Sequence, residues 1–197
     1  YLTTQLLELN IPMILVLNMM DEVITSGNSI DIDGLKDRLE MDIVPISASK
    51  NEGIEDVITA IENNLDKPSQ HIDICHGVVH KAIHSISHIV EQSAQSLQLP
   101  LRYCVTKIIE GDDEMFDQLH IDQGDRHIIE HILQKMEEEA GTDREAALVD
   151  MRYSFIEDVC KQTVFIESET KEQIRSEKID RLLTHKYLGI PIFILIM

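Results

Sequence analysis

The chain has 197 residues, enough for one large domain or two small ones with a substantial hydrophobic core. Its 17 basic and 36 acidic side chains give a formal charge of −19 at pH 7, and this acidic excess argues against nucleic acid as a partner. Cys75, Cys104 and Cys160 form no C-x-x-C pair, which argues against a disulfide framework or zinc ribbon and favours a reducing compartment, with the three as small buried side chains.

The first 65 residues alternate between helical and strand patterns. Apolar runs without alternation indicate buried strands, and apolar residues at helical spacing, such as Leu35 and Leu39, indicate the covering face of a helix. In chain order we expect a helix at residues 1–8, a fully buried strand at 13–17, a loop at 25–29, a helix at 30–40, a strand at 42–46 and a helix at 53–65. This order predicts a parallel sheet with covering helices.

The pattern changes near Lys67 and Pro68. From residue 74 to residue 183 there are helical periodicities and no convincing buried strand. We expect helices at residues 74–97, 101–110, 112–119, 126–140, 142–166 and 171–184. A boundary near residue 68 therefore separates an α/β unit from an all-α domain.

Two of these helices carry marked stripes. In the helix at 142–166 the stripe is apolar and consists of Leu148, Met151, Phe155, Val159 and Cys160. In the helix at 74–97 it consists of His76, His80, His84 and His88, each one turn from the next. Adjacent histidines at this spacing can chelate a divalent metal, but the apolar residues lie on the opposite face, so we expect solvated histidines and assign no metal site.

The first motif follows the first predicted strand, in the stretch "LVLNMMDE", where Asn18 and Asp21 are three positions apart. In an open parallel sheet, ligands bind outside the carboxyl ends of the strands. A carboxylate can accept both N1–H and N2–H₂ of guanine, and an asparagine amide can meet O6 or N7 or brace a neighbouring loop. Alone, N-x-x-D is a weak signal, because a polar strand end with a turn gives the same pattern.

The second motif follows the second predicted strand, in the stretch "PISASKNEG". Ser47, Ala48 and Ser49 form a tight turn that opens a helix, and a small residue there lets a backbone N–H approach a purine O6. Strand, N-x-x-D, helix, strand, S-A and helix is the order of the fourth and fifth motifs of GTP-binding proteins.

The chain resembles the FeoB-type ferrous iron transporters. Most small GTPases have Lys after the Asn, whereas Met19 in "LNMMDE" resembles the FeoB variant. The stretch "IIEGDDEMFDQL" resembles that family's helical spacer, and "DMRYSFIEDV" with "SEKIDRLLTHKYLGIPIFILIM" resembles the approach to its first transmembrane helix. The resemblance covers nearly the whole chain and is weakest at residues 69–100 and 120–140.

The resemblance implies a fold and a set of ligands. It implies a partial GTPase unit of the P-loop type at residues 1–68, a helical spacer domain that stabilises GDP binding at 69–184, and the start of a transmembrane segment at 185–197. The residues implied at the guanine base of GTP or GDP are Asn18, Met19, Asp21, Ser47, Ala48 and Ser49. The implied partners are guanine nucleotide and the protein's own Fe²⁺ permease domain, at the cytoplasmic face of the inner membrane, and a homo-oligomer is compatible with this.

Hydrolysis needs parts that this sequence does not contain. There is no G-x-x-x-x-G-K-[ST] motif, and the D-x-x-G at Asp31–Gly34 follows the N-x-x-D motif, so we interpret Asp31 as a helix cap. We expect the phosphate and Mg²⁺ contacts upstream of Tyr1 and no GTP turnover by this chain alone. The alternative function is a non-catalytic helical adaptor or metal-binding module on a degenerate α/β remnant.

The last stretch, "YLGIPIFILIM", is apolar but shorter than the roughly 20 residues that a spanning helix needs. Lys178, Arg181 and Lys186 precede it, and basic residues that flank a membrane segment stay on the cytoplasmic side. We therefore expect a chain that continues at both ends, with this run as the start of a membrane segment. A buried C-terminal helix is the alternative.

Overall fold

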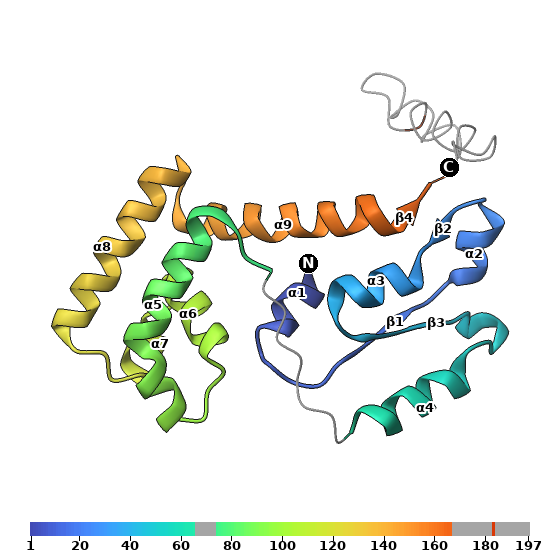
Figure 1. Cartoon of the computed structure of the whole chain (residues 1–197), viewed down its shortest axis with the longest axis horizontal. Coiled ribbons are helices and arrows are strands. Elements are labelled where there is room, and N and C mark those ends of the chain that lie inside the picture. Colours follow the sequence, from blue (N-terminus) through green and yellow to red (C-terminus); the bar gives the residue numbers. More distant parts are fainter. Residues whose placement is uncertain (66–73, 167–182, 184–197) are drawn as a thin grey trace.

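Two parallel strands organise the first part of the chain. The computed structural model describes residues 1–65, 74–166 and 183 (Figure 1). Strands β1 (Ile14–Leu17) and β3 (Asp42–Pro45) pair in parallel over their full length. Parallel neighbours cannot be joined by a tight hairpin, and helix α3 (Ile32–Leu39) lies within the crossover between them. The predicted parallel unit is therefore confirmed.

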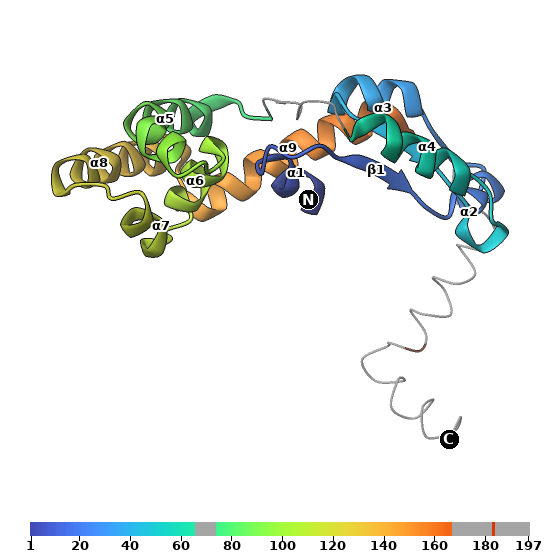
Figure 2. The same cartoon turned by 90° about the horizontal axis from the view of Figure 1, so that it is seen from below.

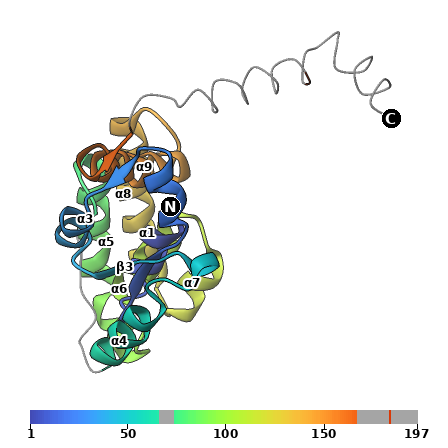
Figure 3. The same ribbon diagram turned by 90° about the vertical axis from the view of Figure 1, so that its right-hand side faces the viewer.

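Helices lie on different sides of these strands, as Figures 1 and 3 show for α3 and α4 (Ile54–Asn64). Leu35 and Leu39 of α3 are buried in one cluster with Ile43 of β3, as their spacing predicts. Asp31 caps α3, since its Oδ1 accepts from the Gly34 N–H at 3.0 Å. The capping interpretation of the D-x-x-G stretch is thus confirmed.

The first strand is less buried than its sequence predicts. Val16 is 37% exposed, and the other three residues of β1 are partly buried. Within the described residues β1 pairs with β3 alone, so its second edge has no strand beside it. The expectation of a fully buried strand is wrong for this reason, because burial of a parallel strand depends on neighbours on both sides.

Short elements complete this lobe. Two of them were not predicted. The helix directly after β1 starts at a left-handed residue, and a two-residue strand is too short for an alternation to show. The short elements are α1 (Leu2–Leu7), α2 (Met20–Thr25), β2 (Ser29–Ile30) and the 3₁₀ turn η1 (Ala48–Lys50).

The second lobe is helical, as predicted. Asp112, Asp122 and Asp143 each cap the helix that follows, because each side chain accepts from the backbone N–H three residues on. Gly141, with φ +72°, ends the fourth helix of this lobe and allows the turn into the fifth. The helices are α5 (Gly77–Ser96), α6 (Leu101–Ile109), α7 (Asp113–Gln118), α8 (Gln123–Ala140) and α9 (Arg144–Thr163).

The core of this lobe lies between α5, α6 and α8. Ile86, Val90, Val105 and Leu133 are completely buried there. Cys104 is also buried, whereas Cys75 is partly exposed and Cys160 is exposed. The expectation of three small buried cysteines is therefore right for Cys104 only.

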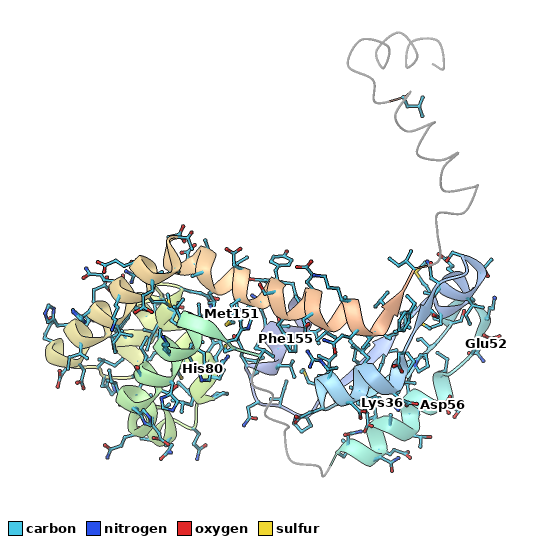
Figure 4. All side chains as sticks on the ribbon, turned by 45° about the horizontal axis from the view of Figure 1, so that its top comes forward. Lys36, Glu52, Asp56, His80, Met151 and Phe155 are labelled. Carbon is cyan, nitrogen blue, oxygen red and sulfur yellow. The ribbon has the colours of Figure 1, made fainter. Side chains whose placement is uncertain are left out.

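Helix α9 runs along both lobes (Figure 2). Met151 belongs to the core of the helical lobe, and Val159 belongs to the core of the α/β lobe, with Phe155 packed against it. Figure 4 shows Met151 and Phe155 one turn apart on this helix. The predicted apolar stripe is correct except for Cys160, which is exposed.

The end of α9 differs from the prediction. The helix ends at Thr163, and the chain continues as the short strand β4 (Val164–Phe165), which pairs antiparallel with β2. The N–H of Asp31 also donates to the carbonyl of Thr163 at 2.7 Å. A two-residue strand at an edge leaves no alternation to detect, so a longer helix was expected.

A buried ion pair joins the lobes. Arg152 of α9 is 2% exposed and Glu8, just after α1, is 6% exposed. The Arg152 guanidinium donates to both Glu8 carboxylate oxygens, each at 3.0 Å from Nη2. The Thr106 hydroxyl of α6 donates to Glu8 Oε2 at 3.0 Å, and Arg152 Nη1 donates to Glu110 Oε1 at 3.3 Å. The pair is therefore fully hydrogen-bonded, as a buried charge must be.

Three predictions concern residues that the structure does not describe. The boundary near residue 68, the helix at 171–184 apart from Leu183, and the apolar run at 187–197 lie outside the described residues. Among the helices that the structure describes, none has both the length and the apolar content needed to cross a bilayer.

Candidate functional site

The two predicted motifs meet at one edge of the sheet. β1 and β3 run in parallel, so the residues that follow them, 18–21 and 46–49, leave the sheet side by side. Two backbone hydrogen bonds hold the exits together: the Ile46 N–H donates to the Leu17 carbonyl at 2.8 Å, and the Met20 N–H donates to the Ile46 carbonyl at 3.1 Å.

Asn18 braces both loops through one atom. Its Oδ1 accepts from the N–H of Met19 at 2.8 Å and from the N–H of Ala48 at 3.1 Å. Backbone N–H donors need an acceptor, so the amide oxygen faces the protein and the amide NH₂ is left at the exposed edge. The residue therefore presents a donor to a ligand.

The Ala48 N–H has an acceptor in this structure, the Oδ1 of Asn18. That a small residue in this turn lets a backbone N–H approach a purine O6 stays a prediction. Among the predicted site residues, Ala48 and Ser49 are exposed and Ser47 is buried.

Met19 has a left-handed backbone, with φ 65° and ψ 31°. Such a conformation costs a non-glycine residue roughly 1–3 kcal/mol, and strained residues of this kind are concentrated at functional sites. The turn at Met19 starts α2 immediately after the strand, which brings Asp21 into the first turn of that helix. Met19 is 52% exposed at the same edge.

Asp21 is held at both carboxylate oxygens. The Ser47 hydroxyl donates to Oδ1 at 2.7 Å, and the Lys50 ammonium lies 3.2 Å from Oδ2. The hydrogen bond from Ser47 is the largest cause of a pKa of Asp21 below its usual 3.8. Desolvation opposes it, and the hydrogen bond and charge of Lys50 lower the pKa further. The carboxylate is thus ionised and fixed in direction.

The loop that holds Ser47 is closed by its own backbone. Ser47 and Glu52 exchange both backbone hydrogen bonds at 3.1 Å. Gly53 follows with φ +78°, and a Cβ atom there would lie 2.7 Å from the Pro45 carbonyl oxygen. Only glycine fits this close approach, which explains the final letter of "SASKNEG". Figure 4 shows Glu52 and Asp56 at this end of the lobe.

Lys50 contacts Asp21 but was not among the residues predicted for this site. It lies three positions after Ser47, at the end of the 3₁₀ turn, and 3.0 residues per turn bring positions i and i+3 to the same side. This spacing is a signal that could have found it, because Ser47 and Lys50 both reach Asp21.

The edge suits a planar ligand with two adjacent donors and an acceptor. Asp21 supplies two fixed acceptor atoms, and Asn18 supplies an amide donor. Within the described residues, no group of three or more His, Cys, Asp and Glu side chains is arranged to hold a metal. The edge can thus recognise the rim of a heterocycle by hydrogen bonds.

The histidine stripe lies elsewhere, on α5. His76, His84 and His88 are exposed and His80 is half-buried, with the rings of His84 and His88 in edge contact at 4.6 Å between centroids. The described apolar residues of α5 that are buried lie on its other faces. Figure 4 shows His80 in the helical lobe, away from the end that carries Glu52.

Two family models match the chain. The FeoB cytosolic helical domain matches residues 76–164, and the model described as ferrous iron transport protein B matches residues 1–61. Among curated proteins, an Fe(2+) transport protein A/Fe(2+) transporter FeoB fusion protein of Porphyromonas gingivalis is 30% identical over the whole chain, and the Fe(2+) transporter FeoB of Salmonella typhimurium is 28% identical. The chain spans 24% and 25% of their lengths.

Solved structures show the same fold. A mutant of S. thermophilus NFeoB bound to GDP superposes with a TM-score of 0.75 at 30% identity, over 83% of this chain and 63% of that chain. NFeoB from S. thermophilus bound to GDP·AlF4⁻ and K⁺ superposes with a TM-score of 0.69 at 30% identity, over 82% of this chain and 63% of that chain.

Proposed function

The chain belongs to the FeoB family of ferrous iron transport proteins, and on that basis we propose that it binds the base of guanine nucleotides and regulates Fe²⁺ uptake. The bound nucleotide is GTP or GDP, with Asn18 and Asp21 reading the base and the loop Ser47–Ser49 supporting them. Met19 covers a face of the base from the adjoining turn.

One observation carries this proposal: the fixed carboxylate of Asp21 beside the amide of Asn18. Guanine offers N1–H and N2–H₂ as neighbouring donors, which two carboxylate oxygens can accept, and its O6 or N7 can accept from the asparagine amide. Ser47 and Asn18 hold the groups before a ligand arrives, so little side-chain entropy is lost on binding. The GDP-bound relatives with this fold support the same ligand.

The role in the whole protein is also part of the proposal. The relatives are Fe(2+) transporters of about four times this length, so a permease domain accompanies this portion. The portion described here lies on the cytoplasmic face of the inner membrane, and the helical lobe links nucleotide state to iron passage. Phosphate and Mg²⁺ contacts come from residues outside this chain, so the chain alone does not turn over GTP.

The experiment is an NMR titration of the ¹⁵N-labelled 197-residue chain with GDP, and with xanthosine diphosphate as the competing base. We expect weak binding that shifts the amides of Asn18, Asp21 and Ser47–Ser49. Asp21→Asn should weaken GDP binding about ten- to a hundred-fold and favour the xanthine base, because the new amide donates where the carboxylate accepted.

Two results would contradict the proposal. One is GDP-induced shifts that avoid this edge, and the other is an unchanged base preference in Asp21→Asn. Steady GTP turnover by the chain, above that of Asp21→Ala, would contradict the expectation of an inactive fragment.

A further inference from the structure

Lys50 lies over the outward-facing side of Asp21. The Ser47 residue that donates to Asp21 Oδ1 is 2% exposed, so this oxygen is turned toward the protein. The ammonium of Lys50, whose side chain is 52% exposed, lies 3.2 Å from Oδ2. The Asp21 side chain itself is only 16% exposed. The oxygen that a ligand from solvent meets first therefore already has a charged donor.

A lysine ammonium and a guanine edge would both donate hydrogen bonds to Asp21 Oδ2. Both present N–H donors to a carboxylate oxygen, and the ammonium adds a full positive charge. A base with two adjacent donors must reach Oδ2 as well as Oδ1, because one oxygen cannot accept a bidentate edge. The four-carbon stem of lysine is flexible, so the ammonium can swing into solvent when a base arrives.

We propose that Lys50 sets the affinity of the guanine site by competing with the base for Asp21 Oδ2, so that it weakens nucleotide binding and favours release. This inference rests on the proposed function, since it assigns a regulating residue to the same site. Ser47 acts differently, because its hydroxyl reaches Oδ1 from the buried side and leaves the second lone pair of this oxygen to a base.

The size of the effect follows from the exposure of the ion pair. The Lys50 side chain is half exposed, so its ion pair is weak and its removal changes an equilibrium constant by up to about five-fold. We therefore expect Lys50→Met to bind guanosine about two- to five-fold more tightly, mainly through slower release. Lys50→Arg keeps the charge and the donors, and should bind like the unaltered chain.

The experiment uses the 197-residue chain and guanosine, which is uncharged and so cannot attract Lys50 through a phosphate. Amide shifts at Asn18, Asp21 and Ala48 report binding, and Lys50→Gln serves as a second variant if Lys50→Met folds poorly. Lys161→Met is the matched control, because it removes a lysine from an exposed ion pair, 2.8 Å from Glu157, on α9.

Each outcome decides the question. Tighter binding by Lys50→Met or Lys50→Gln, with Lys161→Met unchanged and Asp21→Ala unable to bind, supports the inference. Equal or weaker binding by the Lys50 variants, while binding still depends on Asp21, overturns the inference and leaves the proposed function intact. Guanosine that shifts none of these amides in any variant overturns both.

Discussion

Three neighbouring side chains share the work at the candidate site. Asn18 uses its oxygen within the protein and its NH₂ outside, Met19 supplies the turn, and Asp21 supplies the acceptors. Two of these side chains are fixed by the loop after β3: the Ala48 N–H fixes the amide of Asn18, and the Ser47 hydroxyl fixes the carboxylate of Asp21. Preorganised hydrogen bonds of this kind allow a small exposed edge to be selective.

The first prediction concerns the charge of Asp21. Ser47→Ala removes the largest cause of its lowered pKa, so the titration midpoint of the carboxyl should rise toward 3.8. A carboxyl whose pKa is lower in the folded state stabilises the fold at pH values above its pKa in the unfolded state. This stabilisation is lost as the pH falls through the pKa in the folded state, which for Asp21 lies below 3.8.

Carboxyl ¹³C NMR between pH 2 and pH 6 measures this midpoint. Lys50→Met should also raise the midpoint, because it removes a hydrogen bond and a positive charge that lower the pKa of Asp21. Equal midpoints in the Ser47→Ala variant and the unaltered chain would show that the hydroxyl does not act on this carboxyl in solution.

At the scale of elements, the tight approach of Gly53 to Pro45 positions the whole loop between β3 and α4. Gly53→Ala combines a positive φ with a Cβ contact of 2.7 Å to a carbonyl oxygen, so we expect a loss of about 1–3 kcal/mol in the free energy of unfolding. Urea denaturation measures it. Gly111→Ala is the control, since Gly111 also has a positive φ, 80°, but open space around its Cβ position.

A smaller loss in Gly53→Ala than in Gly111→Ala would mean that the close contact is relieved by movement of the loop. In that case the amide shifts of Ser47 and Ala48 should change in Gly53→Ala, because the loop carries both residues.

The elements show which parts of this fold a sequence can predict. The longer helices, such as α3, have enough residues for a helical period to appear, as Leu35 and Leu39 illustrate. Strands β1 and β3 were predicted as apolar runs without alternation. The motif residues were found because they follow strands that pair in parallel. The helix after Met19 and the β2–β4 pair were not found, since a left-handed turn and two-residue strands leave no periodic signal. Lys50 was missed because its role depends on the exact turn.

At the scale of the whole molecule, one buried ion pair fastens the lobes together. Removing one partner leaves an unpaired buried charge, so Arg152→Met should cost about 3–5 kcal/mol in the free energy of unfolding. The double variant Glu8→Met with Arg152→Met should recover much of this loss, because no charge is then left buried. Urea denaturation of both single variants and the double variant gives the coupling between the two residues.

An exposed ion pair on α9 serves as the control for this experiment. Lys161→Met breaks an exposed pair on the same helix and should change the free energy of unfolding far less than Arg152→Met does. A loss in Arg152→Met as small as that in Lys161→Met would show that water reaches Glu8 and Arg152.

The shared helix α9 also bears on the order in which the chain is completed during synthesis. The core of the first lobe includes Val159, and β2 finds its partner only at residues 164–165. A ribosome that adds about 5–20 residues each second needs roughly 5–20 s to travel from residue 65 to residue 165. Over that interval the emerging α/β lobe has Leu39 and Ile43 without their late neighbour, so this is the stage at which a chaperone that binds apolar segments has its best access to the newborn protein.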